Sequence, residues 1–376
     1  MKTIKLPFRL SKPILACGSD LKGAFALAEG REAILIEGFG DLAELENFEK
    51  YEKALKKNER KFHIKPAVIA CDLHPGYAST RFGEDVQRRA YSVKLCKVQH
   101  HEAHIASAIV DNNVKGGVIG VAFDGTGFGS DGNMWGGEFF LGHLKAFKRV
   151  AHFEYVQMPG ADMAVIEPWR MAASYLYNIY GDDFLKLKVG FVKKLDRNKW
   201  AILKKMIDGG MNSPLTSSTG RLFDAVASMI LLKDKAAFEA ELPIELEKTA
   251  LEACRDSYGF DVKPDKDTSV INTSKIIRGV INDLSKDINR SIIASRFHNT
   301  IADIVLKVSL NLRERFGVNK VILSGGVFQN RYLSTRTIEI LVSEDFKVYA
   351  HSNIQTNDSG IPIGQIAIAN ARTSCA

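Results

Sequence analysis

The chain has 376 residues, which is more than one ordinary hydrophobic core accommodates and suits two lobes. Hydrophobic residues make up 45% and charged residues 25%, which is usual for a globular protein. No apolar run approaches the ~20 residues that span a bilayer, and the first residues lack the apolar core of a secretory signal. We therefore expect a cytoplasmic globular protein without membrane contact. The net charge of +7 is a mild excess that favours anionic nucleotides or an acidic protein partner and gives nucleic-acid binding little support.

Short β-branched apolar runs predict strands at residues 14–17, 24–28, 33–36, 67–71, 117–123, 138–141, 321–323 and 347–350. Longer stretches with apolar residues at helical spacing predict helices at residues 42–56, 101–110, 168–180, 221–232, 285–315 and 364–371. The segments 186–213 and 263–275 are interpreted as inserted helices and loops. This order predicts an α/β protein of two lobes, and the turn residues 158–162 place the lobes at 1–155 and 156–376.

A histidine cluster in residues 98–107 is the densest chemical signal. His100 and His104 are four residues apart, so on a helix both imidazoles project from one face, whereas His101 points elsewhere. Neutral imidazole is a common ligand for iron, zinc and similar metals. A surface histidine cluster is the alternative. The five cysteines are dispersed without a CxxC pair, which predicts free thiols and argues against a structural zinc site.

A glycine-rich turn follows the strand predicted at residues 117–123. Asp124 ends that strand and Gly125 and Gly127 follow, so backbone N–H groups here could approach an anion closely. Asp124 could complete a metal shell or hold a magnesium-bound phosphate. A simple β-hairpin turn is the alternative, since Asp-Gly is a common hairpin signal.

Small hydroxyl residues and Gly220 stand at a predicted helix start in residues 216–227. The free N–H groups and dipole of such an end favour a phosphate, and Asp224 could accept ribose hydroxyls. An ordinary capped helix is the alternative reading.

Two further turns follow strands in the last part of the chain. Gly325 and Gly326 come after three apolar residues and precede Asn330 and Arg331, a pattern that suits nucleotide contacts near the end of a strand. Asp358 precedes the last helix and could be a metal ligand, although a capping role would be usual for an isolated aspartate there.

Together these segments resemble one family, the hydrogenase maturation carbamoyltransferases of HypF type, and specifically their C-terminal domain. The segments that carry the resemblance run in family order and lie at residues 16–22, 72–80, 98–107, 124–138, 167–172, 218–227, 297–299, 324–333 and 357–358. The resemblance implies a two-lobed actin-like (ASKHA, RNase H-like) fold with a nucleotide cleft between the lobes, as in the TsaD-type transferases.

Site residues follow from the resemblance by position. It implies one divalent metal, iron or zinc, held by His100, His104, Asp124 and Asp358. It implies an adenylate, or ATP, in contact with the remaining glycine turns and polar residues, and two basic residues near the phosphate or carbamoyl group. The implied nucleotide contacts are Gly125, Gly127, Gly220, Asp224, Gly325, Gly326 and Asn330, and the implied basic residues are Lys22 and Arg331.

The implied reaction is carbamoyl transfer from carbamoyl-adenylate to the C-terminal cysteine of a HypE-type protein, a step in making the cyanide ligand of nickel–iron hydrogenase. Adenylate formation would belong to a separate YrdC-like domain or protein. Two alternatives stay open at this point: a tRNA threonylcarbamoyl transferase-like enzyme, and a non-catalytic nucleotide-binding partner of a split maturation complex.

Overall fold

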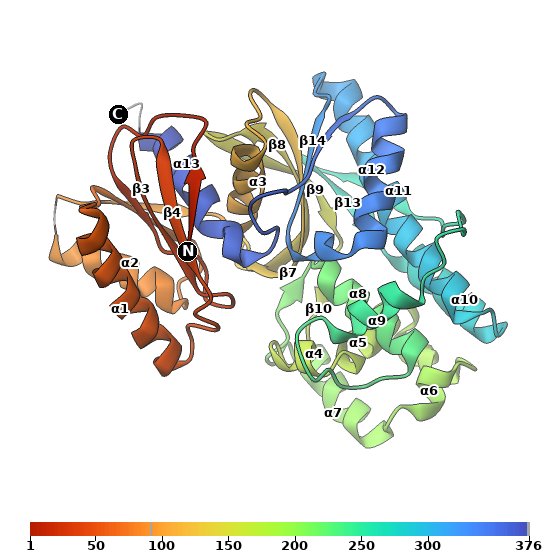
Figure 1. Cartoon of the computed structure of the whole chain (residues 1–376). Coiled ribbons are helices and arrows are strands. Elements are labelled where there is room, and N and C mark those ends of the chain that lie inside the picture. Colours follow the sequence, from red (N-terminus) through yellow and green to blue (C-terminus); the bar gives the residue numbers. More distant parts are fainter. Residues whose placement is uncertain (91, 374–376) are drawn as a thin grey trace.

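The computed structural model describes residues 1–90 and 92–373 and arranges them around two β-sheets, with helices between them and on their outer faces (Figure 1). The first sheet runs in the order β1-β4-β3-β2-β5-β6. Its strands are Lys2–Lys5 (β1), Ile14–Ala16 (β2), Ala24–Glu29 (β3), Glu32–Glu37 (β4), Val68–Asp72 (β5) and Lys94–Val98 (β6). β2, β5 and β6 are parallel, while β3, β4 and β1 add antiparallel strands at one side.

The inner strands of the first sheet, β2 to β5, are buried on both faces because they are apolar at successive positions. Leu15 and Phe25 point to the core shared with α1 (Leu45–Phe62) and α2 (Ala78–Arg89). Ile14 and Ala26 point to the opposite core, which includes residues of α3 (His100–Asp111) and α13 (Ile361–Thr373). The last helix of the chain therefore packs on the N-terminal sheet (Figure 1).

The second sheet runs in the order β12-β13-β9-β8-β7-β14-β15, with β11 paired to β8 and β10 paired to β11. β7 is parallel to β14 and antiparallel to β8. The strands are Val118–Phe128 (β7), Met134–His143 (β8), Ala146–Phe153 (β9), Val156–Gln157 (β10), Leu215–Thr216 (β11), Asp261–Asp265 (β12), Thr268–Asn272 (β13), Lys320–Ser324 (β14) and Lys347–Tyr349 (β15).

Helices cover both faces of β7, an interior strand of this sheet that lies between β8 and β14. Val118 and Ala122 pack with Ile105 of α3, whereas Val121 and Phe123 face the core of α8 (Thr219–Leu231) and α11 (Arg290–Phe316). The other helical segments are Met163–Ile166 (α4), Trp169–Tyr180 (α5), Gly181–Lys186 (η1), Gly190–Lys194 (α6), Arg197–Asp208 (α7), Glu241–Thr249 (α9), Ser274–Ser285 (α10), Gly326–Gln329 (η2), Arg331–Ser343 (α12) and Asp358–Gly360 (η3). α3 thus lies between the two sheets and touches both halves.

The expected lobes of 1–155 and 156–376 do not coincide with the two sheets. β7, β8 and β9 pair with strands of the second sheet, so the change from one sheet to the other falls between β6 and β7. The turn at residues 158–162 is an internal turn of the second half, because β10 and β11 pair on either side of it. We propose the lobe boundary in the segment between β6 and β7, with α13 returning to the first lobe.

Each predicted helix and strand overlaps an observed one, with two corrections. The helix predicted at 285–315 begins later, at Arg290, because α10 ends at Ser285 and Asn289 caps α11 through its side chain. The segment 263–275, interpreted as loop or helix, contains most of the β12–β13 hairpin. Cys17, Cys71, Cys96 and Cys254 are free, as expected, and Cys375 lies outside the described residues. Among the described residues, no helix is both long and apolar enough to span a bilayer.

Candidate metal centre and adjoining cleft

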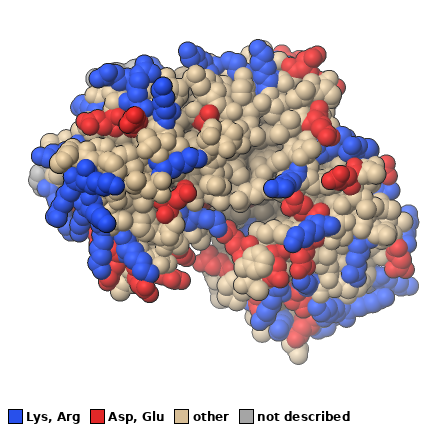
Figure 2. Space-filling view, in the orientation of Figure 1, with Lys and Arg blue, Asp and Glu red and all other residues tan. Residues whose placement is uncertain are grey.

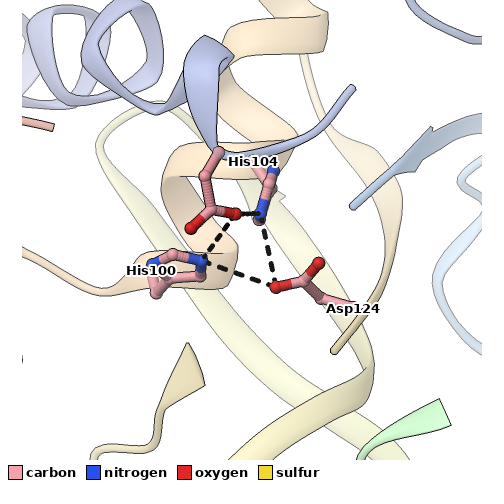
Figure 3. A group of neighbouring side chains, drawn as sticks. His100, His104 and Asp124 are labelled. Atoms are coloured by element: carbon pink, nitrogen blue, oxygen red, sulfur yellow. Dashed lines mark ion pairs between the residues drawn. The ribbon is translucent and has the colours of Figure 1, made fainter. Parts of the chain in front are cut away.

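Four side chains from three separate segments, α3, β7 and η3, converge on one point. His100 and His104 project from one face of α3, Asp124 comes from the end of the apolar part of β7, and Asp358 begins η3. Figure 3 shows the two imidazoles and Asp124 turned toward one point. One potential ligand atom from each residue lies within 4.8 Å of the others. The structure therefore brings together all four residues that the resemblance nominated for a metal.

Distances within the cluster suit a shared cation better than direct hydrogen bonds. The Nε2 atom of His100 is 3.6 Å from Asp124 Oδ2 and 3.6 Å from Asp358 Oδ1. The Nε2 atom of His104 is 3.7 Å and 3.4 Å from the same two oxygens. Direct N–H···O bonds are usually about 2.9 Å. Four ligands at about 2.1 Å from one ion would be about 3.4 Å apart at tetrahedral angles, close to the observed spacing.

Burial gives a second reason to place a cation here. His100 and His104 are fully buried, and Asp124 and Asp358 are 6% and 7% exposed. Within the described part of the chain, neither Nε2 atom has a hydrogen-bond partner. Buried polar atoms without a partner are rare and costly, so the residues fit a metal ion as the missing partner. Two imidazoles and two carboxylates suit iron or zinc and do not select between them.

The two carboxylates dominate the electrostatics of the cluster. Burial by itself lowers the pKa of His100, but Asp358 and Asp72 raise that pKa well above its ordinary value. Burial also lowers the pKa of His104, and Asp124 and Asp358 more than compensate. Although burial raises the pKa of a carboxyl group, the imidazoles lower the pKa of both Asp124 and Asp358. The acids stay ionised, so a cation that displaces the imidazole protons meets a favourable potential.

Each carboxylate has one oxygen held by the protein and one oxygen turned to the imidazoles. The Gly326 N–H donates to Asp124 Oδ1 at 2.9 Å, and the Ser19 hydroxyl donates to Asp358 Oδ2 at 3.0 Å. At the other end of α3, Asp111 accepts backbone N–H groups of residues 352–354. The helix that carries both histidines therefore also anchors the loop that leads to Asp358.

Asp72, at the end of β5, orients His100 from behind. The ring Nδ1 of His100 is 2.8 Å from Asp72 Oδ2, and both side chains are fully buried. The Nδ1–H donates to the carboxylate, which leaves the Nε2 lone pair for the cluster. Asp72 lies in a segment that carried the resemblance, but no local pattern marked it as a partner of a histidine 28 residues away.

Asp72→Asn is expected to weaken metal binding about tenfold, because the neutral amide polarises the His100 ring less than a carboxylate does. The dissociation constant for zinc, measured by competition with a chromogenic chelator, checks this. Asp85→Asn is a matched control, since Asp85 is half exposed on α2. Equal zinc affinity of the two variants would contradict the role given to Asp72.

The cluster lies at the wall of a pocket of about 290 Å³ between the two halves of the molecule. Figure 2 shows this face hollowed near its middle, with acidic and basic side chains around the hollow. Seven of the residues expected at the site line the pocket: Lys22, Asp124, Gly125, Gly220, Gly326, Asn330 and Asp358. Gly220 is required by close packing, since a Cβ there would lie 2.8 Å from the Cα of Gly125.

Two of the expected phosphate contacts have a structural basis. The β7–β8 pairing shifts register between Phe123 and Gly127, so Gly125 and Thr126 leave the regular ladder beside the pocket. Opposite them, Ser218 caps α8 through its side chain, and the first turn of that helix contributes Gly220 and Arg221 to the pocket wall. A helix start next to irregular glycine backbone is a suitable environment for an anion.

Four expected nucleotide or basic residues do not line the pocket. Gly127 packs against the His101 and His100 rings, and Gly325 has a φ of +101° and a position where a Cβ would lie 2.2 Å from the Phe123 carbonyl oxygen. These two glycines make close packing possible behind the site. The remaining two, Asp224 and Arg331, are turned to other partners.

Asp224 is buried and pairs with Arg221, whose Nη2 is 2.8 Å away. Burial raises the pKa of Asp224 to about 6, although Arg221 lowers it. Arg331 is exposed and lines a separate hollow with Tyr332 and Arg336. Ribose contact by Asp224 and phosphate contact by Arg331 would both need a different side-chain arrangement.

Lys22 has a partner that the sequence did not indicate. Its Nζ is 2.6 Å from Glu239 Oε2, and both residues line the pocket from opposite halves of the molecule. Partial burial lowers the pKa of Lys22, but the bond to Glu239 and the nearby Asp358 and Asp124 raise it above its ordinary value. Lys22 therefore stays cationic beside the cleft.

Comparison with known proteins gives a consistent result over most of the chain. The model described as "HypF Kae1-like domain" matches residues 9–111, and that described as "Carbamoyltransferase, Kae1-like Domain, second subdomain" matches residues 120–365. The carbamoyltransferase HypF of Synechocystis sp. is 30% identical over 96% of this chain and 48% of its own length. The carbamoyltransferase HypF homolog of Cupriavidus necator is 29% identical over 97% of this chain and 93% of its own length.

A solved structure, described as full-length HypF in the phosphate- and nucleotide-bound form, superposes with a TM-score of 0.91 at 36% identity and covers 98% of this chain. This chain covers 57% of that protein, and it spans about half the length of the Synechocystis relative. The gap between the two matched regions, residues 112–119, runs from the end of α3 into the first residues of β7, where the chain enters the second sheet.

Proposed function

Because the chain belongs to the HypF carbamoyltransferase family, we propose that it transfers a carbamoyl group from carbamoyl-adenylate to the C-terminal cysteine of a HypE-type acceptor in nickel–iron hydrogenase maturation. The observation that carries the proposal is the contact between the four-residue cluster and the pocket. Asp124 and Asp358 belong to both, so a cation held by the cluster would face a phosphate bound in the pocket. The phosphate- and nucleotide-bound state of the solved relative supports such an occupant.

Different residues of the pocket would make different contacts with the bound adenylate. The irregular backbone at Gly125 and Thr126 and the start of α8 would hold the phosphate, and Lys22 would contribute a positive charge. A divalent ion in the cluster would act as a Lewis acid toward the phosphate. In the reaction the acceptor thiolate forms a bond to the carbamoyl carbon, the bond from that carbon to the phosphate oxygen breaks, and AMP leaves with the negative charge.

Positioning is the main task left to the protein in this reaction. The thiolate is itself a strong nucleophile and the adenylate is already activated, so holding the two in line supplies much of the rate. Lys22 and the start of α8 would stabilise the charge that grows on the departing phosphate. A separate YrdC-like domain or protein would supply the adenylate.

The test reconstitutes the transfer. The zinc- or iron-loaded chain is mixed with a HypE-type acceptor and a YrdC-like enzyme that makes carbamoyl-adenylate, and the acceptor is examined by mass spectrometry. We expect a thiocarbamate on the C-terminal cysteine that depends on the chain and is absent from an acceptor with serine at that position. An unmodified acceptor in the presence of adenylate would refute the transfer. Modification of tRNA adenosine instead would favour the threonylcarbamoyl alternative, and adenylate binding without any transfer would favour a non-catalytic partner.

A further inference from the structure

The segment Phe297-His298-Asn299 carried part of the resemblance, yet the proposed reaction assigns no role to any of its three side chains. It lies in α11, and all three side chains are buried. His298 is directly behind the pocket wall, with its ring 5.2 Å from the ring of Phe223, which lines the pocket. A fully buried histidine with no place in the metal cluster needs a separate explanation.

Hydrogen bonds define the protonation of His298. Its Nδ1 is 2.7 Å from the Ala294 carbonyl oxygen, which can only accept, so Nδ1 carries the hydrogen and donates. Burial lowers the pKa of His298 to about 4, so the ring is neutral at physiological pH. The other nitrogen, Nε2, must then be an acceptor. Asn330 Nδ2 lies 2.9 Å from it and donates.

The same contacts leave the Asn330 amide one orientation. Its Oδ1 accepts the backbone N–H of Leu333 at 2.8 Å and caps α12, while its Nδ2 donates to His298. If the amide were flipped, its oxygen would face the Nε2 lone pair and its NH₂ would face the Leu333 N–H. Both contacts would be repulsive and both partners would lose a hydrogen bond.

An amide nitrogen carries two hydrogens, and His298 uses one of them. Asn330 itself lines the pocket, beside Val327 and Gln329. The second N–H therefore belongs to a side chain at the pocket wall whose orientation is fixed by its hydrogen bonds to His298 and Leu333. A ligand group that accepts a hydrogen bond would match it, and a donor group would not.

We propose that His298 is a positioning residue that holds the Asn330 amide so that the pocket offers an N–H, and not a carbonyl oxygen, to a hydrogen-bond acceptor of the bound nucleotide. This inference rests on the proposed function, since it requires a nucleotide in the pocket. A packing role is the competing explanation, because the His298 ring also lies 5.2 Å from the Tyr332 ring. Packing needs a ring of similar size, whereas positioning needs an acceptor at Nε2.

Three substitutions separate these explanations when ATP binding to the full chain is measured by calorimetry. His298→Phe keeps an aromatic ring and removes the acceptor, and we expect about tenfold weaker binding. His298→Gln places a carbonyl oxygen near the Nε2 position and is expected to stay within about threefold of wild type. His298→Leu provides a second variant without an acceptor, should the phenylalanine fail to fold. The melting temperature and zinc content verify that each variant is folded.

A double-mutant cycle with Asn330→Ala tests whether His298 acts through Asn330. If it does, His298→Phe has no further effect on ATP binding once Asn330 is alanine. Equal ATP affinity of wild type and His298→Phe, or full additivity of the two losses, would overturn the positioning role while leaving the proposed function intact. Absence of ATP binding by the wild-type chain would overturn both.

Discussion

Replacing His104 by alanine is expected to remove the metal from the chain and to slow carbamoyl transfer by about three orders of magnitude. The Nε2 of His104 is one of four ligand atoms that face a common point, and its nearest carboxylate oxygen is 3.4 Å away. A three-ligand remainder holds the ion weakly, and Lewis-acid stabilisation of the departing phosphate is worth several kcal/mol, each ~1.4 kcal/mol being tenfold in rate. Metal analysis of the purified variant and the thiocarbamate assay are the two measurements.

Two further variants make this result specific to the cluster. Asp358→Asn removes a different ligand from a different segment and should give the same double loss, because both residues serve one ion. His143→Ala removes an exposed histidine at the end of β8 and should leave both readouts at the wild-type level. If His104→Ala retained its metal and transferred at the wild-type rate, the cluster would have no part in the chemistry.

Gly364→Ala is expected to destabilise the fold by about 3 kcal/mol or more and to weaken metal binding at the same time. Gly364 lies where α13 crosses α3, and a Cβ there would be 1.8 Å from the Ala103 carbonyl oxygen and 2.6 Å from its carbonyl carbon. Backbone cannot move aside as the end of a flexible side chain can, so the helices must separate. This cost exceeds the gain of about 1 kcal/mol from replacing glycine within a helix.

Separation of α13 from α3 would also disturb the site, since Ala103 is next to His104 and α13 follows Asp358 directly. Urea denaturation and zinc affinity measure the two consequences. Gly117→Ala is the matched control, because the nearest atom to its Cβ would be 3.8 Å away. A Gly364→Ala protein as stable as the Gly117→Ala protein would show that the two helices are not packed as closely as described.

Local features of the site could be predicted from the sequence. His100 and His104 share a helix face because they are four residues apart, and this spacing holds wherever the helix lies. The turns at Gly125 and Gly326 were predicted because each apolar run is followed by a polar residue and then by glycine. The convergence of Asp124 and Asp358 on the histidines was expected only through the family resemblance, because 234 residues of sequence separation carry no local signal of contact.

The sequence did not predict which side chains pair with one another around the site. Arg331 stands beside Asn330 in the chain, yet only Asn330 lines the pocket, since the first turn of α12 directs the two side chains differently. Asp224 is buried and pairs with Arg221 three residues earlier on α8, so its carboxylate faces that guanidinium, and only Arg221 of the two lines the cleft. Glu239 reaches Lys22 across 217 residues from a loop with no recognisable pattern.

By itself the sequence determined the helices and strands, the pair of imidazoles and the family, because these depend on residues close together or on matched motifs in order. The tertiary structure decided which sheet β7 joins, how α13 returns to the first sheet, and which donors hold the carboxylates of Asp124 and Asp358. An apolar strand can be buried equally well beside several different strands, so the packing of the whole chain determines which strands it pairs with. The candidate metal centre is formed by that choice, since its ligands meet only where the two sheets and α3 come together.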